Sequence, residues 1–474
     1  MQSRKGQQPA FHYRKLPKVK ISILGAAGVR TPLIIQAIQA RQDRLGLTEL
    51  CLMDIDADHL ELIGALISPI TDSTDTKFVI TGTTDPIQAL TNANFVITTF
   101  RVGNIESRVI DERVPLDHGI LGQETTGAGG FAMGLRSIPV LLDYVKLMQH
   151  VCPDAWMINF ANPAGMLTEA VVRHTDWHRI IGICDGPASM HQFIAAILQA
   201  KPKDVYLDYF GLNHLGWVKS VIYQNKDHLP DLMQSARSLG NIPELPFDIA
   251  FLISLGLIPN EYLYYYYYRT QAVNNILEAG ECRGEMIARL NPKLFTDLSE
   301  KLTNGDFEGM QTAYHAYLDR RHKTYMVNET GKNHDYFKHD TALFESVANE
   351  GYAGVALNLI EGLLGNAKTV QILNVHNQGA VPGMEDNDVV EIPALVSHNH
   401  VQPLAVNNIP VHCMGLMLQV KQYEHLTIEA ALENSYQKAL LALATHPLVS
   451  DYTLAKSILD DYILRHKDYF PVLE

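Results

Sequence analysis

The amino-acid sequence predicts an α/β protein with two parts. The N-terminal part is expected to be a doubly wound, mostly parallel sheet, because apolar strand-like runs alternate with helical stretches from Val19 onward. The C-terminal part is expected to be mixed α+β and mostly helical, because longer helical segments with short β-like runs follow residue 200. The expected divisions are a flexible arm at 1–17, a first domain at 18–199 and a second at 200–474.

Length and composition narrow the class of protein. A chain of 474 residues with 47% hydrophobic and 19% charged residues is long enough for two well-buried lobes. The net charge of −14 argues against general binding to nucleic acid or to an anionic membrane. The 5 cysteines are odd in number and scattered, which favours a reducing compartment over a disulfide framework. No signal-peptide core and no run of eighteen apolar residues is present, so we expect a cytoplasmic protein.

The first strand–turn–helix unit has the pattern of a dinucleotide-binding site. The apolar run KISILG leads into a glycine turn and a helical stretch, and the next apolar run ends in Asp54. In this order the turn amides bind a pyrophosphate and the acid binds the adenosine ribose, so we expect a Rossmann-like NAD-binding domain. A third glycine is missing, and Thr31 stands near its place. The turn residues expected to contact the cofactor are Gly25, Ala26, Gly28 and Val29.

The later strand-like runs each end in polar residues. The runs at 92–100, 155–160 and 179–184 lead into Arg101, Asn162 and Asp185 respectively. Because the carboxyl ends of parallel strands share one edge of a sheet, these side chains are expected beside the nicotinamide half of the cofactor, with Arg101 among its ligands. The glycine-rich segment at 122–130 carries Glu124. An acid would repel phosphate, so this segment is expected to bind sugar hydroxyls.

Cys184 and His214 are a candidate metal pair. Cys184 ends the strand-like run at 180–183, and His214 lies in a polar break after the run at 205–210. A thiolate and an imidazole suit a borderline transition metal, and substrate or water would complete the shell. The alternative is that Cys184 is a small buried hydrophobic residue and His214 a hydrogen-bonded structural one.

Six tyrosines crowd into the segment at 262–268. They are consistent with an aromatic core helix or a subunit contact. A tyrosine near a cation can also serve as a general base, although the pattern does not single out which one. Arg283 lies in a helical setting, where a surface ion pair is the alternative to a binding role. The amphipathic stretch at 426–463 is expected to form a packing or oligomer surface.

Seven motifs in order resemble glycoside hydrolase family 4, closest to its 6-phospho-β-glucosidases. They are RVGN, GQETTGAGG, FANPAGMLTEA, GICDGP, GLNHLGW, PNEYLYYYYY and VVEIPALV. The resemblance implies hydrolysis with NAD and a divalent metal, typically manganese. In that route C3 of the sugar is transiently oxidised, a base removes the C2 proton and the aglycone is eliminated. Water then adds, and the hydride returns to the sugar.

The resemblance also implies roles for individual residues. The metal would be held by Cys184 and His214 with the sugar O2 and O3, and Tyr262 matches the base. The 6-phosphate and neighbouring hydroxyls match Arg108, Asn162 and Arg283, while Glu124 matches a ligand of sugar hydroxyls. The substrate would be a phosphorylated disaccharide or an aryl glucoside, and the family is usually dimeric or tetrameric.

Asp185 departs from the nearest relatives. Many phospho-β-glucosidases of the family carry Asn after the cysteine, whereas its phospho-α-glucosidases carry Asp as the acid that protonates the leaving group. Asp185 is therefore a candidate catalytic acid that keeps a 6-phospho-α-glucosidase open. Two other classes also stay open: an NAD-dependent dehydrogenase of the lactate/malate type, and a nucleotide-binding regulatory protein without chemistry.

Overall fold

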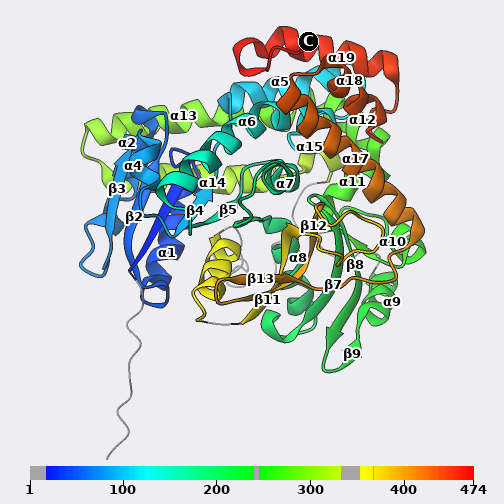
Figure 1. Cartoon of the computed structure of the whole chain (residues 1–474), viewed down its shortest axis with the longest axis horizontal. Coiled ribbons are helices and arrows are strands. Elements are labelled where there is room, and N and C mark those ends of the chain that lie inside the picture. Colours follow the sequence, from blue (N-terminus) through cyan, green and yellow to red (C-terminus); the bar gives the residue numbers. More distant parts are fainter. Residues whose placement is uncertain (1–17, 240–244, 333–352, 367) are drawn as a thin grey trace, which may run out of the picture.

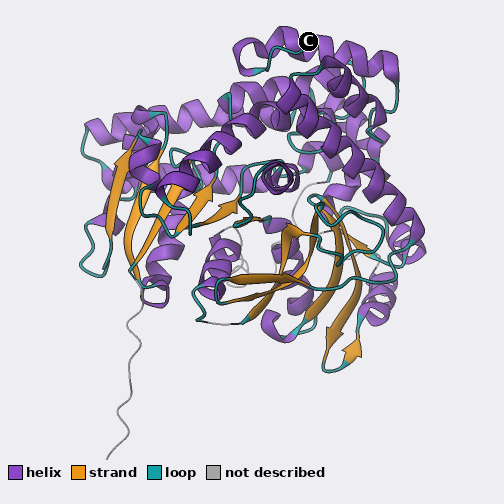
Figure 2. Ribbon diagram, viewed as in Figure 1, coloured by secondary structure: helices purple, strands orange, loops and turns teal. Residues whose placement is uncertain are grey.

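A nine-stranded sheet runs through the computed structural model, which describes residues 18–239, 245–332, 353–366 and 368–474 (Figures 1 and 2). The predicted arm at 1–17 lies outside the described residues. The strands of this sheet are β1 (Val19–Leu24), β2 (Leu47–Met53), β3 (Val79–Thr83), β4 (Phe95–Thr98), β5 (Trp156–Asn159), β6 (Ile180–Gly182), β11 (Thr369–His376), β12 (Val389–Ser397) and β13 (His400–Pro403). They lie in the order β13-β12-β11-β6-β5-β4-β1-β2-β3.

The six N-terminal strands are parallel and confirm the predicted doubly wound fold. Their order reverses at β1, which pairs with β2 on one side and β4 on the other. The register aligns the strand ends, because Leu24 lies opposite both Met53 and Thr98, Thr98 opposite Asn159, and Asn159 opposite Gly182. The loops that follow these strands therefore meet along one edge, where open α/β sheets bind ligands.

The C-terminal part of the chain completes the same sheet. β11 pairs antiparallel with β6 through Asn374 and Gly182, and β12 and β13 follow antiparallel. A second, antiparallel sheet contains β7 (Tyr206–Leu212), β8 (Leu215–Tyr223), β9 (Lys226–Asp227) and β10 (Ile258–Pro259). The two sheets meet where β12 packs on β7.

Helices make up most of the rest of the described chain (Figure 2). In the N-terminal half they are α1 (Thr31–Leu45), α2 (Ala57–Leu66), α3 (Ser68–Thr71), α4 (Pro86–Leu90), α5 (Asn104–Asp117), α6 (Ala128–Val151), α7 (Ala164–His174) and α8 (Asp185–Ile197). In the C-terminal half they are α9 (Leu229–Leu239), α10 (Ile249–Leu255), α11 (Tyr264–Tyr267), α12 (Arg269–Ala279), α13 (Arg283–Thr303), α14 (Phe307–Lys323), α15 (Val327–Thr330), α17 (Val411–Glu433), α18 (Tyr436–Thr445) and α19 (Tyr452–His466), with a further helix at 353–363.

Two packing contacts decide where the C-terminal helices lie. The apolar faces of α13 and α14 form a small core with α2, which includes Leu66, Leu298 and Met310. At the other end, α17 packs on α6 and α19 on α5, so the red C-terminal helices lie beside the cyan ones in Figure 1. The first contact brings the ends of α13 and α14 close to the sheet edge described above.

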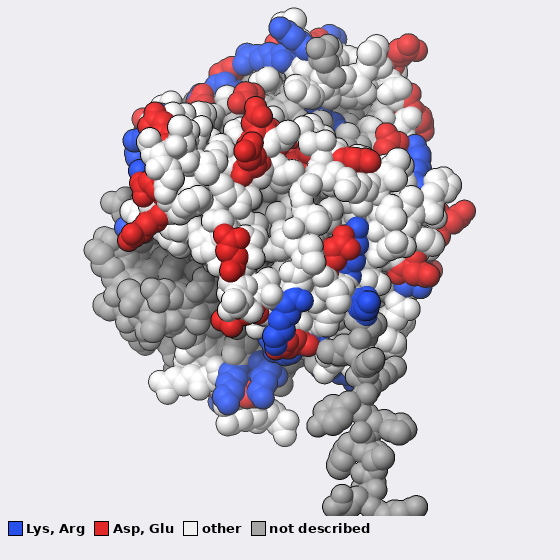
Figure 3. Space-filling model, turned by 90° about the vertical axis from the view of Figure 1, so that its left-hand side faces the viewer, with Lys and Arg blue, Asp and Glu red and all other residues white. Residues whose placement is uncertain are grey.

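The outer surface has mixed character. Among the described residues on the face shown in Figure 3, acidic and basic side chains are interspersed rather than separated by sign. Within the described part of the chain, no helix has both the length and the apolar composition needed to cross a membrane.

Candidate active site

Cys184 and Asp185 lie at the carboxyl edge of the sheet, directly after β6. Cys184 is the N-cap of α8 and is 7% exposed. Asp185 is the first residue of α8, where the helix dipole favours a negative charge. Its side chain is 41% exposed, and Oδ2 lies 3.6 Å from Nη1 of Arg30 in the glycine turn. The carboxylate therefore faces the cofactor turn, while the thiol points into the protein.

His214 occupies the tight turn between β7 and β8, with φ +63°. The glycines on either side of this turn make it possible. A Cβ at Gly211 would lie 2.2 Å from the carbonyl oxygen of Leu215, and one at Gly216 would lie 2.0 Å from the hydroxyl of Tyr209. The buried imidazole lies flat against the ring of Tyr262, with 3.7 Å between centroids and 5° between planes.

Tyr262 reaches His214 because β10 pairs with β8. Directly after β10, the amide of Asn260 donates to the Gly216 carbonyl at 2.8 Å, and the Asn260 Oδ1 accepts from the Tyr262 amide at 2.9 Å. A Cβ at Gly186 would lie 3.2 Å from Asn260 Nδ2 and 3.7 Å from the Cys184 sulfur. The structure thus brings Cys184, His214 and Tyr262 together from three separate elements.

The remaining tyrosines of the cluster have different surroundings. Tyr264 and Tyr268 stack on each other and pack around Phe247, and Tyr264 and Tyr265 are buried. The aromatic-core interpretation therefore holds for these residues, while Tyr262 faces the site.

The donor set at this point fits a divalent metal. Burial lowers the pKa of His214 to about 4, so the imidazole is neutral, and its Nδ1 is buried with no hydrogen-bond partner among the described residues. Burial raises the pKa of the Cys184 thiol well above its usual value, and the charges of Glu391 and Asp185 add to this. A thiolate here therefore requires a cation, which is what a metal would supply.

The glycine turn between β1 and α1 has the geometry expected of a cofactor cradle. Gly25 has φ +92°, and a Cβ there would lie 2.4 Å from the amide nitrogen of Phe100. At Gly28, by contrast, the nearest atom to an added Cβ is 3.5 Å away. Asp54 follows β2 as predicted, and its Oδ2 accepts from the Ala27 amide at 2.8 Å. The Asp54 carboxylate thus holds the backbone of the turn in place.

Buried Arg108 and partly buried Glu124 belong to one ion-pair network. Arg108 Nη1 lies 2.9 Å from Glu124 Oε2, and Arg108 Nε donates to Glu112 at 2.8 Å. Arg101 also pairs with Glu124, so this predicted cofactor ligand lies on the side of the predicted sugar ligands. Burial alone would raise the pKa of Glu124, but Arg108 and Arg101 hold it well below its usual range. Glu124 is therefore a fixed carboxylate.

The segment that carries Glu124 is only partly a loop. Its last residues, Ala128 to Gly130, form the first turn of α6. A Cβ at Gly129 would lie 2.1 Å from the Gln123 carbonyl oxygen, and one at Gly130 would lie 2.0 Å from that of Thr125. These glycines let the chain fold tightly back on itself, which the sequence did not reveal.

Arg283 begins α13, close to this network. Its position is fixed by a capping box in which the Cys282 amide donates to Glu285 Oε2 at 2.9 Å. The neighbouring Gly284 amide donates to Glu112 at 2.6 Å, which ties α13 to α5. Burial and the nearby charge of Arg108 lower the pKa of Arg283. Its partners are a hydroxyl and a backbone carbonyl, so the surface ion pair considered above does not form.

Asn162, the remaining predicted ligand, is partly buried in the loop between β5 and α7, at the same sheet edge. Four further residues adjoin the site without having been singled out from the sequence: Asn260, Arg321, Tyr325 and Glu391. A signal existed for Glu391, an acid inside the apolar run VVEIPALV, and for Asn260 in PNEYL. Arg321 lies in the last turn of α14 and Tyr325 directly after it, in a stretch without a motif.

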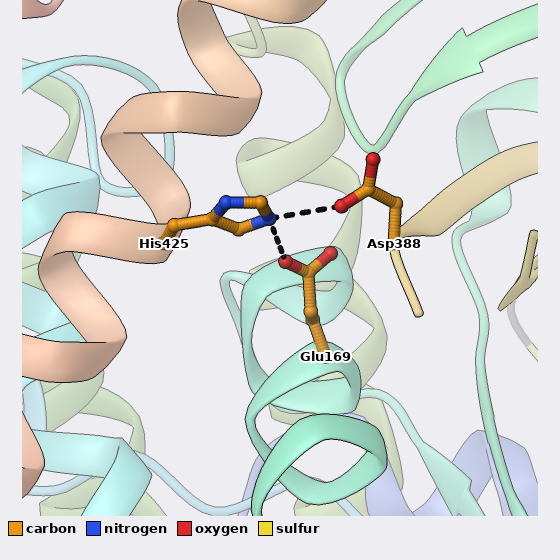
Figure 4. A group of neighbouring side chains, drawn as sticks. All are labelled: Glu169, Asp388 and His425. Carbon is orange, nitrogen blue, oxygen red and sulfur yellow. Dashed lines mark hydrogen bonds and ion pairs between the residues drawn. The ribbon is translucent and has the colours of Figure 1, made fainter. Parts of the chain in front are cut away.

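A second ionisable group, Glu169, Asp388 and His425, lies apart from the residues above (Figure 4). Its ligand-type atoms lie within 4.8 Å of one another, as in a metal site. However, His425 Nε2 lies 2.8 Å from Glu169 and 2.9 Å from Asp388, and Lys421 lies 2.6 Å from Glu169. Because cationic side chains already neutralise both carboxylates, this group is an ion-pair network that joins α7, α17 and the residue before β12.

Comparison with known proteins shows that both halves of the chain resemble one protein family. A family model described as "Family 4 glycosyl hydrolase" matches residues 20–200, and "Family 4 glycosyl hydrolase C-terminal domain" matches residues 209–449. The chain is 32% identical over 464 residues to a Bacillus subtilis protein named probable 6-phospho-beta-glucosidase, covering 96% of this chain and 97% of the relative.

Two solved structures extend this similarity to three dimensions. A 6-phospho-beta glucosidase from Thermotoga maritima, with NAD and glucose 6-phosphate, has a TM-score of 0.81 and 26% identity, covering 96% of this chain and 100% of the other. A 6-phospho-alpha-glucosidase from gut microorganisms, with NAD and Mn²⁺, also has a TM-score of 0.81, with 28% identity and coverage of 96% and 100%. The similar proteins thus act on both linkages.

Proposed function

This chain belongs to glycoside hydrolase family 4. We propose that it hydrolyses 6-phospho-β-glucosides with NAD and a divalent metal, and that this metal is manganese. The observation that carries the proposal is the stacked pair of His214 and Tyr262 beside Cys184, at the carboxyl edge of a doubly wound sheet. The similar structures with NAD, Mn²⁺ or glucose 6-phosphate support it.

The residues divide the chemistry among them. When bound, the cofactor would supply reversible hydride transfer and the metal would supply Lewis-acid chemistry. The turn at Gly25 and Gly28 would hold the cofactor, and Cys184 and His214 would hold the metal. Tyr262 would remove the C2 proton with its phenolic oxygen. Burial raises the pKa of Tyr262 well above its usual value, so this role depends on a nearby cation that lowers it again.

The arginines supply the phosphate site in this proposal. Arg108 is buried in its ion pairs with Glu112 and Glu124, Arg283 is partly buried, and the charge of Arg108 contributes to the lowered pKa of Arg283. Burial lowers the pKa of Arg321 to about 10, and the charges of Arg30 and Arg283 add to the effect. A dianionic 6-phosphate would relieve this repulsion through charge-assisted hydrogen bonds. Asn162 would bind a neighbouring hydroxyl, and the fixed carboxylate of Glu124 would accept from sugar hydroxyls.

A 6-phospho-α-glucosidase is the second candidate, and Asp185 is the observation that favours it. The carboxylate is partly exposed at the start of α8, where it could protonate a leaving group. We favour the β-linkage because GAGGF, NPAGM and PNEYL resemble the β-glucosidases, while Asp185 alone resembles the α-glucosidases.

Release of nitrophenol from 4-nitrophenyl 6-phospho-β-D-glucoside tests the proposal. We expect release only with both NAD⁺ and Mn²⁺, much less from the unphosphorylated glucoside, and less from the matched α-linked substrate. Full turnover after exhaustive removal of NAD⁺ and metal would contradict the mechanism. Faster cleavage of the α-linked substrate, reduced in Asp185→Asn chiefly for poor leaving groups, would select the second candidate.

The same assay distinguishes the proposed hydrolase from a dehydrogenase and from a regulatory protein without catalytic activity. A dehydrogenase of the lactate/malate type would show a net change in nicotinamide absorbance during turnover, whereas the proposed hydrolase returns the hydride in every cycle. A regulatory protein without chemistry would release no nitrophenol.

A further inference from the structure

Tyr325 lies in the short turn that joins α14 to α15. The next residue, Met326, has φ +55°, a left-handed conformation that few non-glycine residues adopt. Arg283 anchors this turn from α13: its Nη2 donates to the Arg321 carbonyl at 2.7 Å, and its Nη1 donates to the Thr324 hydroxyl at 2.7 Å. The guanidinium of Arg283 therefore fixes the turn from which the Tyr325 side chain extends.

The Tyr325 side chain contacts two residues of the candidate site. Its hydroxyl donates to the hydroxyl of Tyr262 at 2.8 Å. Its ring lies beneath the guanidinium of Arg283, with 5.9 Å from Cζ to the ring centroid, which is within the range of a cation–π contact. With 37% of its surface exposed, Tyr325 forms part of the wall of the site rather than of the core.

We propose that Tyr325 is a positioning residue that couples recognition of the substrate phosphate at Arg283 to the placement of the Tyr262 phenol. The inference rests on the proposed function, because it assigns a phosphate to Arg283 and the C2 proton to Tyr262. It adds a physical link between the two ends of the substrate site. The side chain of Tyr325 hydrogen-bonds to Tyr262, the proposed base, and lies against Arg283, the proposed phosphate-binding residue.

The two contacts of Tyr325 should have separable effects. The hydroxyl fixes the Tyr262 oxygen within the site, and small misplacements of a reacting group are costly in rate. The ring supports the Arg283 guanidinium in one orientation, which favours phosphate binding because less freedom is then lost on binding. Loss of the hydroxyl should therefore lower kcat, and loss of the ring should also weaken the affinity for the phosphate.

Two variants test this separation. Tyr325→Phe keeps the ring, and we expect its kcat on the phosphorylated glucoside to fall on the order of tenfold with KM nearly unchanged. Its isotope effect with C2-deuterated substrate should rise, because proton removal becomes slower. Tyr325→Leu also loses the ring, and we expect an additional rise in KM and a weaker calorimetric affinity for glucose 6-phosphate.

Tyr436→Phe is the matched control, because Tyr436 on α18 also donates its hydroxyl to a side chain, Asp460, at 2.7 Å. It should leave kcat, KM and the isotope effect unchanged. An active wild-type protein whose Tyr325→Phe variant matches this control would overturn the inference alone. The inference would also be overturned if Tyr325→Phe and Tyr325→Leu lost kcat to the same extent and lost affinity for glucose 6-phosphate to the same extent. A wild-type protein inactive on 6-phosphoglucosides would overturn the proposed function, and the inference with it.

Discussion

At the scale of single residues, the contact between His214 and Tyr262 sets the chemistry of the site. The His214 Nδ1 is buried with no hydrogen-bond partner in the described part of the chain, and the ring of Tyr262 is stacked on the imidazole. Burial keeps His214 neutral, which is the form that can coordinate a metal, and keeps Tyr262 protonated, so the proposed role of Tyr262 as a base depends on a nearby cation. In the proposed function, metal binding would therefore activate the site.

The Cys184→Ser variant tests the metal site at this scale. We expect its Mn²⁺ affinity, measured by titration calorimetry, to fall at least about tenfold, because a hydroxyl is a poor substitute for a thiolate on a borderline metal. Glucose 6-phosphate affinity measured without metal should change little. Cys413→Ser, which changes another buried cysteine far along the chain, is the control. Unchanged Mn²⁺ binding in Cys184→Ser would move the ligand assignment to other residues.

At the scale of elements, the β1–α1 turn uses its two glycines for different purposes. Gly25 is required by the fold, since it has φ +92° and its Cβ position is filled by the backbone of Phe100. Gly28 has no such requirement among the described residues, because an added Cβ there meets only the Gly25 carbonyl oxygen among them, at ordinary contact distance. A glycine that the protein itself does not need is typical of a position where a ligand backbone or phosphate approaches closely.

Alanine substitutions should separate these two purposes. We expect Gly28→Ala to keep its thermal midpoint but to bind NAD⁺ on the order of tenfold more weakly, because the methyl group occupies the path of the pyrophosphate. Gly25→Ala should be destabilised by at least about 1–3 kcal/mol through backbone strain alone. Gly64→Ala, in α2 with nothing within 4 Å of the added Cβ, should change neither property unfavourably. Wild-type NAD⁺ affinity in Gly28→Ala would contradict the cofactor assignment of this turn.

At the scale of the whole molecule, the network of Glu169, Asp388 and His425 joins elements far apart in the sequence. Glu169 lies on α7, Asp388 directly precedes β12, and His425 lies on α17. Burial alone would lower the pKa of His425, but Asp388 and Glu169 raise it to about 9. Since the unfolded value is near 6.5, this contribution to stability is complete below about pH 6.5 and is lost as the pH rises through about 9.

Chemical denaturation at pH 6.5 and pH 9.5 tests the network. We expect the wild-type protein to lose on the order of 2–3 kcal/mol of stability over this interval through His425. In His425→Gln this decrease should be largely absent, and the protein should be less stable than wild type at pH 6.5. His400→Gln, which changes an exposed histidine on β13, should keep the wild-type dependence. The same pH dependence in wild type and His425→Gln would refute the role of this network.

Much of the fold could be predicted from the sequence, because strands, helices and turns have local signals. The alternation of apolar runs and helices predicted the parallel strands, and the position of Asp54 after β2 followed from the run that precedes it. The placement of Cys184 after β6 and of His214 between two strands was likewise readable, since each depends on where a strand ends. The resemblance to the family indicated which of the six neighbouring tyrosines, Tyr262, is the candidate base.

Which side chains come into contact could not be predicted from the sequence. The antiparallel addition of β11 to β6 depends on a pairing across nearly two hundred residues, and no local pattern records it. Tyr325 approaches Tyr262 because α13 and α14 pack on α2 and because Arg283 holds the turn after α14. Burial, which sets the protonation of His214 and Tyr262, is likewise a property of the assembled layers. Contacts and burial arise from packing between distant segments, whereas strands and turns arise from neighbours in the chain.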